Sequence, residues 1–91
     1  MKIKVSDYIA NRLADHGICH VFTVTGGGAM HLNDSLGHCP KLSCMYHHHE
    51  QAAAMAAEAY ARVDNQMAAV CVTTGPGATN AITGALCAWM D

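Results

Sequence analysis

The amino-acid sequence predicts an α/β fold, a parallel sheet with helices on both faces in the doubly wound arrangement. The main observation is that segments with helical periodicity alternate with short β-branched or aromatic runs throughout the chain. Strands that are joined through helices take right-handed crossovers, which makes them parallel. No repeat, low-complexity tract or linker interrupts the alternation, so we expect a single domain over residues 1–91.

A helix and a strand begin the predicted order. Residues 5–13 place apolar side chains on one helical face, with Ser6 as the candidate N-cap and Gly17 as the candidate terminator. Residues 20–25 are rich in β-branched and aromatic side chains and stop at three glycines. That pattern is typical of a buried strand that runs into a turn.

The rest of the chain repeats this order. A short helix over residues 29–36 is expected to close at Gly37. Further on, an alanine-rich segment has strong intrinsic helix propensity. The last segment carries Ile82, Leu86 and Trp89 at helical spacing. The remaining predicted elements are strands at 42–46 and 67–73 and helices at 50–63 and 80–90.

Composition and charge narrow the function classes. The chain is 52% hydrophobic and 13% charged, and its five Lys and Arg residues are scattered, which offers no footprint for a nucleic-acid backbone. No apolar run is long enough to cross a membrane, and the start breaks into charge before a signal-peptide core forms, so we expect a cytoplasmic protein without a membrane partner. The five cysteines are odd in number and several lie in apolar runs, which predicts buried thiols without disulfides.

Three informative motifs follow the three predicted strands. In open parallel sheets the ligand lies beyond the carboxyl ends of the strands, which is where these motifs are placed. Glycine lets another molecule approach the backbone closely, whereas Pro76 stiffens its turn, so the last motif is suited to a flat ligand. The motifs are TGGG at 25–28, YHHHE at 46–50 and TGPG at 74–77.

A simpler interpretation of the two glycine motifs stays open, since a glycine turn between a strand and a helix is often only a turn. Neither motif matches a nucleotide fingerprint. The first has His31 where GxGxxG requires its last glycine, and the second lacks the GK[ST] ending of a phosphate-binding loop. Phosphate binding by these loops alone is therefore not expected.

Glu50 begins a predicted helix and has two interpretations. The helix macrodipole favours a carboxylate there by roughly 0.3–1 kcal/mol, so Glu50 can be a solvated first-turn acid. The functional interpretation depends on the small-residue segment 52–57, which is expected to pack closely and to exclude water. A carboxyl group held beside it should have a raised pKa and share a proton with a ligand nitrogen.

The histidines at 47–49, with Cys39 and Cys44 upstream, invite a metal-site interpretation. Consecutive strand residues point to opposite faces, so the three rings are not expected to converge. The pattern C-x4-C followed by HHH is not a standard zinc pattern either. We therefore assign no metal ligand.

The most specific functional signal is a pair of motifs. HEQ at 49–51 leads into EAYAR at 58–62, and TGPGATN follows at 74–80. At this separation the pair resembles the N-terminal pyrimidine-binding (PYR) domain of thiamine-diphosphate-dependent enzymes, the acetolactate-synthase-like branch in particular. The resemblance covers essentially the whole chain. It implies that the three predicted strands are an incomplete portion of a larger, flavodoxin-like domain.

The resemblance also implies roles for individual residues. The glutamate that matches Glu50 hydrogen-bonds ring nitrogen N1′ of the aminopyrimidine and favours the cofactor form that loses its C2 proton, so Glu50 is the implied catalytic residue. The cofactor itself carries the chemistry on a 2-oxo acid. Thr79 is expected to brace the turn or to touch the cofactor. The implied cofactor-binding residues are Glu50, Thr74, Gly75, Pro76, Gly77 and Asn80; the implied substrate-side loop, at a dimer interface, is Gly26, Gly27 and Gly28.

The family places other parts of the site outside these motifs. It holds the diphosphate and Mg²⁺ in a separate carboxy-terminal domain with a GDG motif, which this sequence lacks. FAD occurs in some relatives, but no residue here supports it. A homodimer or homotetramer that acts on a small 2-oxo acid is implied for the full-length form.

Two function classes stay open on the sequence alone. The first is the N-terminal part of a thiamine-diphosphate-dependent 2-oxo acid lyase or synthase that binds and activates the cofactor aminopyrimidine. The alternative is a noncatalytic truncated product or small interaction module that retains part of the fold.

Overall fold

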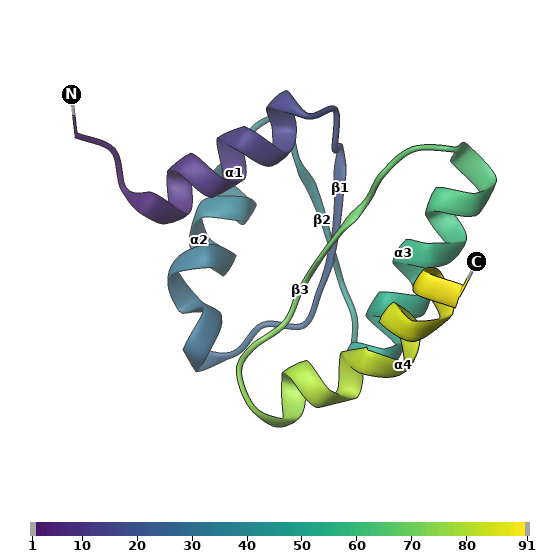
Figure 1. The fold of residues 1–91 in the computed structure, drawn as a ribbon. Helices are drawn as coiled ribbons and strands as arrows, with labels where there is room; N and C mark the ends of the chain where they lie inside the picture. Colours follow the sequence, from purple (N-terminus) through teal and green to yellow (C-terminus); the bar gives the residue numbers. More distant parts are fainter. Residues whose placement is uncertain (1, 91) are drawn as a thin grey trace.

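A computed structural model describes residues 2–90 of the chain. Helices and strands alternate through this range as the sequence predicts (Figure 1). The elements are α1 (Val5–Asp15), β1 (His20–Thr23), a 3₁₀ turn η1 (Gly27–Ala29), α2 (Met30–His38), β2 (Ser43–Tyr46), α3 (Glu50–Asp64), β3 (Ala69–Cys71) and α4 (Pro76–Met90).

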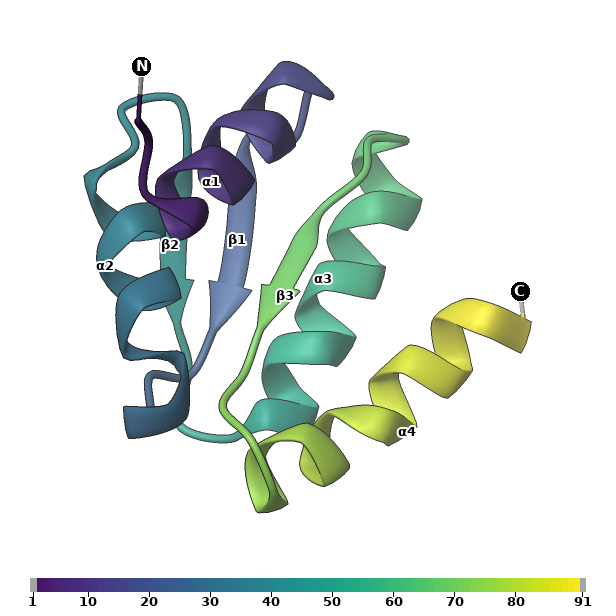
Figure 2. The same ribbon diagram turned by 60° about the vertical axis from the view of Figure 1, so that its left-hand side comes forward.

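The three strands form one parallel sheet in the order β2-β1-β3 (Figure 2), which confirms the predicted fold class. Strand β1 is central, and its Val21 lies opposite Cys44 of β2 and Ala69 of β3. Each strand is shorter than predicted, because regular pairing is confined to the stretch that the strands share. All three carboxyl ends therefore meet at one edge of the sheet.

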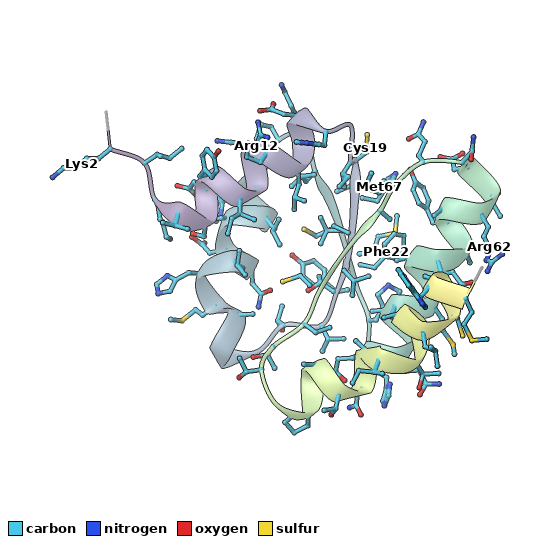
Figure 3. The ribbon with its side chains drawn as sticks, in the orientation of Figure 1. Lys2, Arg12, Cys19, Phe22, Arg62 and Met67 are labelled. Atoms are coloured by element: carbon cyan, nitrogen blue, oxygen red, sulfur yellow. The ribbon has the colours of Figure 1, made fainter. Side chains whose placement is uncertain are left out.

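Adjacent residues of β1 point to opposite faces and separate the core into two layers. Val21 is fully buried in the cluster that contains Ala10 of α1 and Leu36 of α2. Phe22 packs on the other face, against Ala53 and other small residues of α3 (Figure 3). Helices α1 and α2 thus cover one face of the sheet and α3 covers the other, so the expectation of helices on both faces is confirmed.

The ends of α1 and α2 differ in part from their predicted signals. Gly17 takes a positive φ of 84° after α1, as expected of a helix terminator. Ser6 is not the N-cap: it is buried inside α1, and its hydroxyl lies 2.8 Å from that of Ser35 in α2. Gly37 does not close α2, which continues to His38. The extended backbone of Cys39 ends that helix instead.

The five cysteines are free thiols that differ in exposure. Cys39 is buried, Cys19 is exposed, and the other three lie between these extremes. Burial raises the pKa of Cys44 and Cys71, so both stay protonated near neutral pH. The expectation of buried thiols is therefore wrong for Cys19, which lies in the short connection between α1 and β1.

Helix α4 begins at Pro76, so the predicted start at Asn80 is wrong. Proline is favoured at the first position of a helix because its φ is preset and its missing N–H needs no partner there. The Thr79 N–H donates to the Gly75 carbonyl over 3.1 Å, and the Thr79 hydroxyl donates to the Pro76 carbonyl over 3.1 Å. The second bond is the bracing contact expected of Thr79. The GPG motif is thus the first turn of a helix.

Helix α4 packs against α3 through small residues. Ala53, Ala54 and Ala57 of α3 are buried, and so is Gly84 of α4. A β-carbon added at Gly84 would collide with the Ala54 side chain and lie 3.0 Å from the Met55 nitrogen. The two helix backbones therefore meet here without intervening side chains, and the close packing expected of the alanine-rich segment is confirmed.

The outer side of α4 and the outer edge of β3 lack partners within residues 2–90. Strand β3 pairs only with β1, and an apolar groove of about 400 Å³ lies between β3, α3 and α4. Ile82, Leu86 and Trp89 are exposed along α4. In the described part of the chain, no helix combines the length and the hydropathy needed to cross a membrane.

Substitution of Gly84 tests the close contact between α3 and α4. We expect Gly84→Ala to lower the free energy of unfolding by up to about 2 kcal/mol. An overpacking cost of roughly 1–3 kcal/mol outweighs the gain of about 1 kcal/mol in helix propensity. Urea unfolding followed by circular dichroism measures the difference.

Gly37→Ala is the matched control, because Gly37 also lies inside a helix but is exposed. A β-carbon there meets only the Tyr46 hydroxyl, at an ordinary 3.6 Å. This variant should gain about 0.4–1 kcal/mol. If both substitutions stabilise the fold equally, the space between α3 and α4 at Gly84 holds a methyl group without strain.

Candidate functional site

Thr73 lies at the centre of the edge where the strands end. It follows β3, and its side chain fills the space beside three glycines from two different segments. A β-carbon added at Gly26 would lie 2.5 Å from the Thr73 Cβ; at Gly28 it would lie 2.8 Å from Oγ1, and at Gly77 2.9 Å from Cγ2. The two glycine motifs predicted from the sequence therefore meet around one threonine.

This arrangement separates the glycines by their physical role. Gly26, Gly28 and Gly77 are needed because the chain packs against them, which is a structural reason for glycine at these three positions. Gly75 has open space around it but takes a φ of +70°, which favours glycine. Gly27 has neither constraint: its φ is ordinary, and nothing lies within 4 Å of an added β-carbon. It is exposed, and no protein atom limits the space beside it.

Glu50 and Asn80 form a direct contact across this edge. Glu50 is the first residue of α3 and is half-buried, whereas Asn80 lies in the second turn of α4. The Asn80 side-chain amide donates to Glu50 Oε1 over 3.1 Å. The other oxygen, Oε2, faces Gly77, where an added β-carbon would lie 3.4 Å away. Three residues that the sequence singled out are therefore brought together.

The pKa of Glu50 is lowered, so the expectation of a raised pKa is wrong. Its own backbone N–H at the start of α3 contributes most, and the Asn80 amide contributes next. Partial burial acts in the opposite direction, and the charge of His49 adds a further lowering. Hydrogen-bond donors stabilise a carboxylate, and here they outweigh the loss of water. Glu50 is therefore ionised at neutral pH.

The histidines before Glu50 have separate structural positions. His49 is the N-cap of α3, where its Nδ1 accepts the Gln51 N–H over 3.0 Å. The His47 ring stacks on Phe22, with ring centroids 5.8 Å apart. The cap fixes the direction of the first turn of α3 and with it the backbone position of Glu50. Across residues 2–90, no three His, Cys, Asp or Glu side chains are grouped as a metal site requires.

The remaining predicted site residues lie at the same edge. Thr74 is close to Gly28, since a β-carbon there would lie 2.8 Å from the Thr74 Oγ1. Pro76 is exposed at the start of α4. Thr73 is the residue that the sequence interpretation missed. Its position directly after an apolar strand and before the glycine motif was a usable signal, because such a side chain must lie among the turns at the sheet edge.

Comparison with known proteins gives a consistent result. Residues 3–91 match the family model described as the thiamine pyrophosphate enzyme N-terminal TPP binding domain. The acetolactate synthase large subunit of Haemophilus influenzae is 38% identical over 99% of the chain, and that of Buchnera aphidicola from Acyrthosiphon pisum is 40% identical over 94%. The isozyme 3 large subunit of Escherichia coli is 38% identical over 94%.

The chain spans only 15–16% of the length of these relatives. The match nevertheless includes both motifs and every residue of the edge described above. This chain belongs to the thiamine pyrophosphate enzyme family and corresponds to its N-terminal TPP binding domain.

Proposed function

We propose that this chain supplies the aminopyrimidine-binding side of a thiamine diphosphate site in an acetolactate-synthase-like enzyme. The observation that carries the proposal is the contact of Glu50 with Asn80 beside Gly77, at the carboxyl edge of a parallel sheet. Ligands of open α/β sheets bind at this edge. The reaction of the whole protein is the conversion of a small 2-oxo acid, as the names of the relatives suggest.

The residues present fit an aminopyrimidine. Its ring nitrogen calls for one carboxyl group, and Glu50 presents Oε2 toward a glycine that has no side chain to cover it. Its flat face calls for a surface without protruding groups, which Gly75 and Pro76 supply at the exposed start of α4. We assign these residues, together with Thr74, Gly77 and Asn80, to cofactor binding.

The protein contributes position and a proton. Thiamine diphosphate, when bound, supplies the carbanion chemistry on the 2-oxo acid. Glu50 is ionised in the ligand-free chain, and a ring that covers it would remove water, which raises the pKa of a carboxyl group. Glu50 would then take up a proton and hold it against ring nitrogen N1′, which has a lone pair and no proton of its own.

Gly27 is the part of the first glycine motif that we assign to the substrate side. Gly26 and Gly28 hold that loop against Thr73 and Thr74, which leaves Gly27 exposed at the turn. A substrate approaching this turn meets backbone only. Packing fixes the loop, and the accessible glycine between its two packed neighbours gives close access.

Other parts of the site are assigned outside this chain. The diphosphate and its Mg²⁺ belong to a second domain, and a homodimer or homotetramer completes the site. No residue here is assigned to FAD. The match over residues 3–91 favours this enzyme class over a noncatalytic module.

Glu50→Gln tests the proton that Glu50 supplies to N1′ in the enzyme that carries this chain. An amide cannot release a proton to N1′, so we expect exchange of the cofactor C2 proton for deuterium to slow by about 10²–10⁴-fold. Quenched-exchange NMR of the bound cofactor measures the rate without requiring turnover.

Glu58→Gln is the matched control on the same helix. Glu58 pairs with Arg62 one turn further on, and loss of that partly exposed pair costs only about 0.3–0.5 kcal/mol. C2 exchange should stay at the wild-type rate in this variant. If exchange is as fast in Glu50→Gln as in the control, Glu50 does not supply the proton to N1′.

Gly27→Ala tests the substrate-side assignment in the same enzyme. The added methyl group meets no protein atom, so the free energy of unfolding should change by less than about 0.5 kcal/mol. KM for the 2-oxo acid should rise roughly ten-fold, because the methyl group occupies substrate space. Steady-state kinetics and a thermal melt give the two quantities.

Gly26→Ala provides the contrast. Its methyl group collides with the Thr73 Cβ, so this variant should lose stability by about 1–3 kcal/mol. An unchanged KM in Gly27→Ala would remove this turn from the substrate side.

A further inference from the structure

The hydrogen bond between Asn80 and Glu50 joins two helices that are far apart in the sequence. Thirty positions separate the residues, and the contact runs from α4 to the first turn of α3. Asn80 is exposed, so its amide has no need of a protein partner for burial. Water could satisfy the Asn80 amide, yet the amide donates to one oxygen of the candidate catalytic carboxylate.

The packing of α3 and α4 fixes this pair. Ala54 lies one turn after Glu50, and Gly84 lies one turn after Asn80, so both pairs stand on matching helical faces. The backbones meet at Ala54 and Gly84, where no side chain can intervene. One turn before Ala54 and Gly84, the two helices are far enough apart for the side chains of Glu50 and Asn80 to meet between them.

The contact distinguishes the two carboxylate oxygens. Asn80 occupies Oε1, and Oε2 faces Gly77. A glutamate side chain on a first helical turn otherwise samples several rotamers. An amide that holds one oxygen selects a rotamer and leaves the other oxygen for a ligand.

We propose that Asn80 is a positioning residue that holds Glu50 through Oε1 and so presents Oε2 to the ligand. The identity of the ligand rests on the proposed function, whereas the hold on Glu50 does not. In this role Asn80 contributes to the cofactor-binding set through Glu50.

The contact has a consequence that can be measured without any ligand. The Asn80 amide is one of the donors that lower the pKa of Glu50, and its loss should raise the midpoint of Glu50 titration. The charged group nearest Glu50 is His49, directly before it. Helix α4 contributes no acidic or basic side chain, since Cys87 is its only titratable residue and lies nearly two turns beyond Asn80.

The test is a pH titration of the ligand-free chain followed by NMR of the side-chain carboxyl carbons. In Asn80→Ala the Glu50 midpoint should move upward, and in wild type the Asn80 side-chain amide should shift with the Glu50 midpoint. Thr79→Ala is the matched control, because Thr79 is adjacent and its hydroxyl donates to the Pro76 carbonyl rather than to Glu50. Its Glu50 midpoint should equal that of wild type.

Stability gives a second readout with a defined sign. A carboxyl pKa that is lower in the native than in the unfolded state stabilises the fold above the unfolded value, and that contribution is lost as pH falls through the native value. Asn80→Ala should therefore lose less stability on acidification than wild type does. Urea unfolding across this pH range measures the difference.

The outcomes separate this proposal from the proposed function. A Glu50 midpoint that is unchanged in Asn80→Ala, with the Asn80 amide silent through the wild-type titration, overturns the positioning role. The wild-type titration decides the question even if the variant does not fold. Fast C2 exchange in Glu50→Gln would instead remove the catalytic role of Glu50, whatever Asn80 does to its titration.

Discussion

The contact of Gly84 with Ala54 is the constraint on which the site depends. Two helix backbones can approach this closely only where both surfaces lack large side chains. The approach sets the distance between the first turns of α3 and α4, and that distance decides whether Glu50 and Asn80 can share a hydrogen bond. A core residue with no chemistry of its own therefore fixes the geometry of a polar pair at the surface.

The sheet supplies the second constraint through its central strand. Val21 and Phe22 send their side chains into different layers, so each layer needs its own kind of partner. The layer under α1 and α2 is aliphatic, whereas the layer under α3 pairs one large aromatic ring with small alanines. The alanines let α3 lie close to the sheet beside this ring.

The order and type of the elements could be predicted because each has a strong local pattern. Residues 50–63 illustrate this, since their alanines give both helix propensity and a small-residue face. The start of α4 could not be predicted in this way. Gly75, Pro76 and Gly77 have the composition of a turn, although proline is also favoured at the first position of a helix. Ser6 likewise fits the sequence pattern of an N-cap, but in the fold its hydroxyl contacts Ser35 of α2.

The site residues could be predicted as a set, but the pKa of Glu50 and the packing around the glycines could not. The motifs identify Glu50 and the glycines. The pKa of Glu50, however, is lowered by its own backbone N–H and by the Asn80 amide, and Asn80 reaches Glu50 only in the folded chain. The glycines divide into packed and accessible ones through contacts with Thr73. No local pattern in the sequence carries that information.

The central position of β1 has a consequence for the newly made chain. Both neighbours of β1 come later in the sequence, and Val21 pairs with Ala69 across 48 intervening steps of synthesis. At about 5–20 residues per second, the ribosome needs roughly 2–10 s to add the second neighbour. During that interval the strand that becomes the most buried has one open side, so assembly of the sheet is timed by translation.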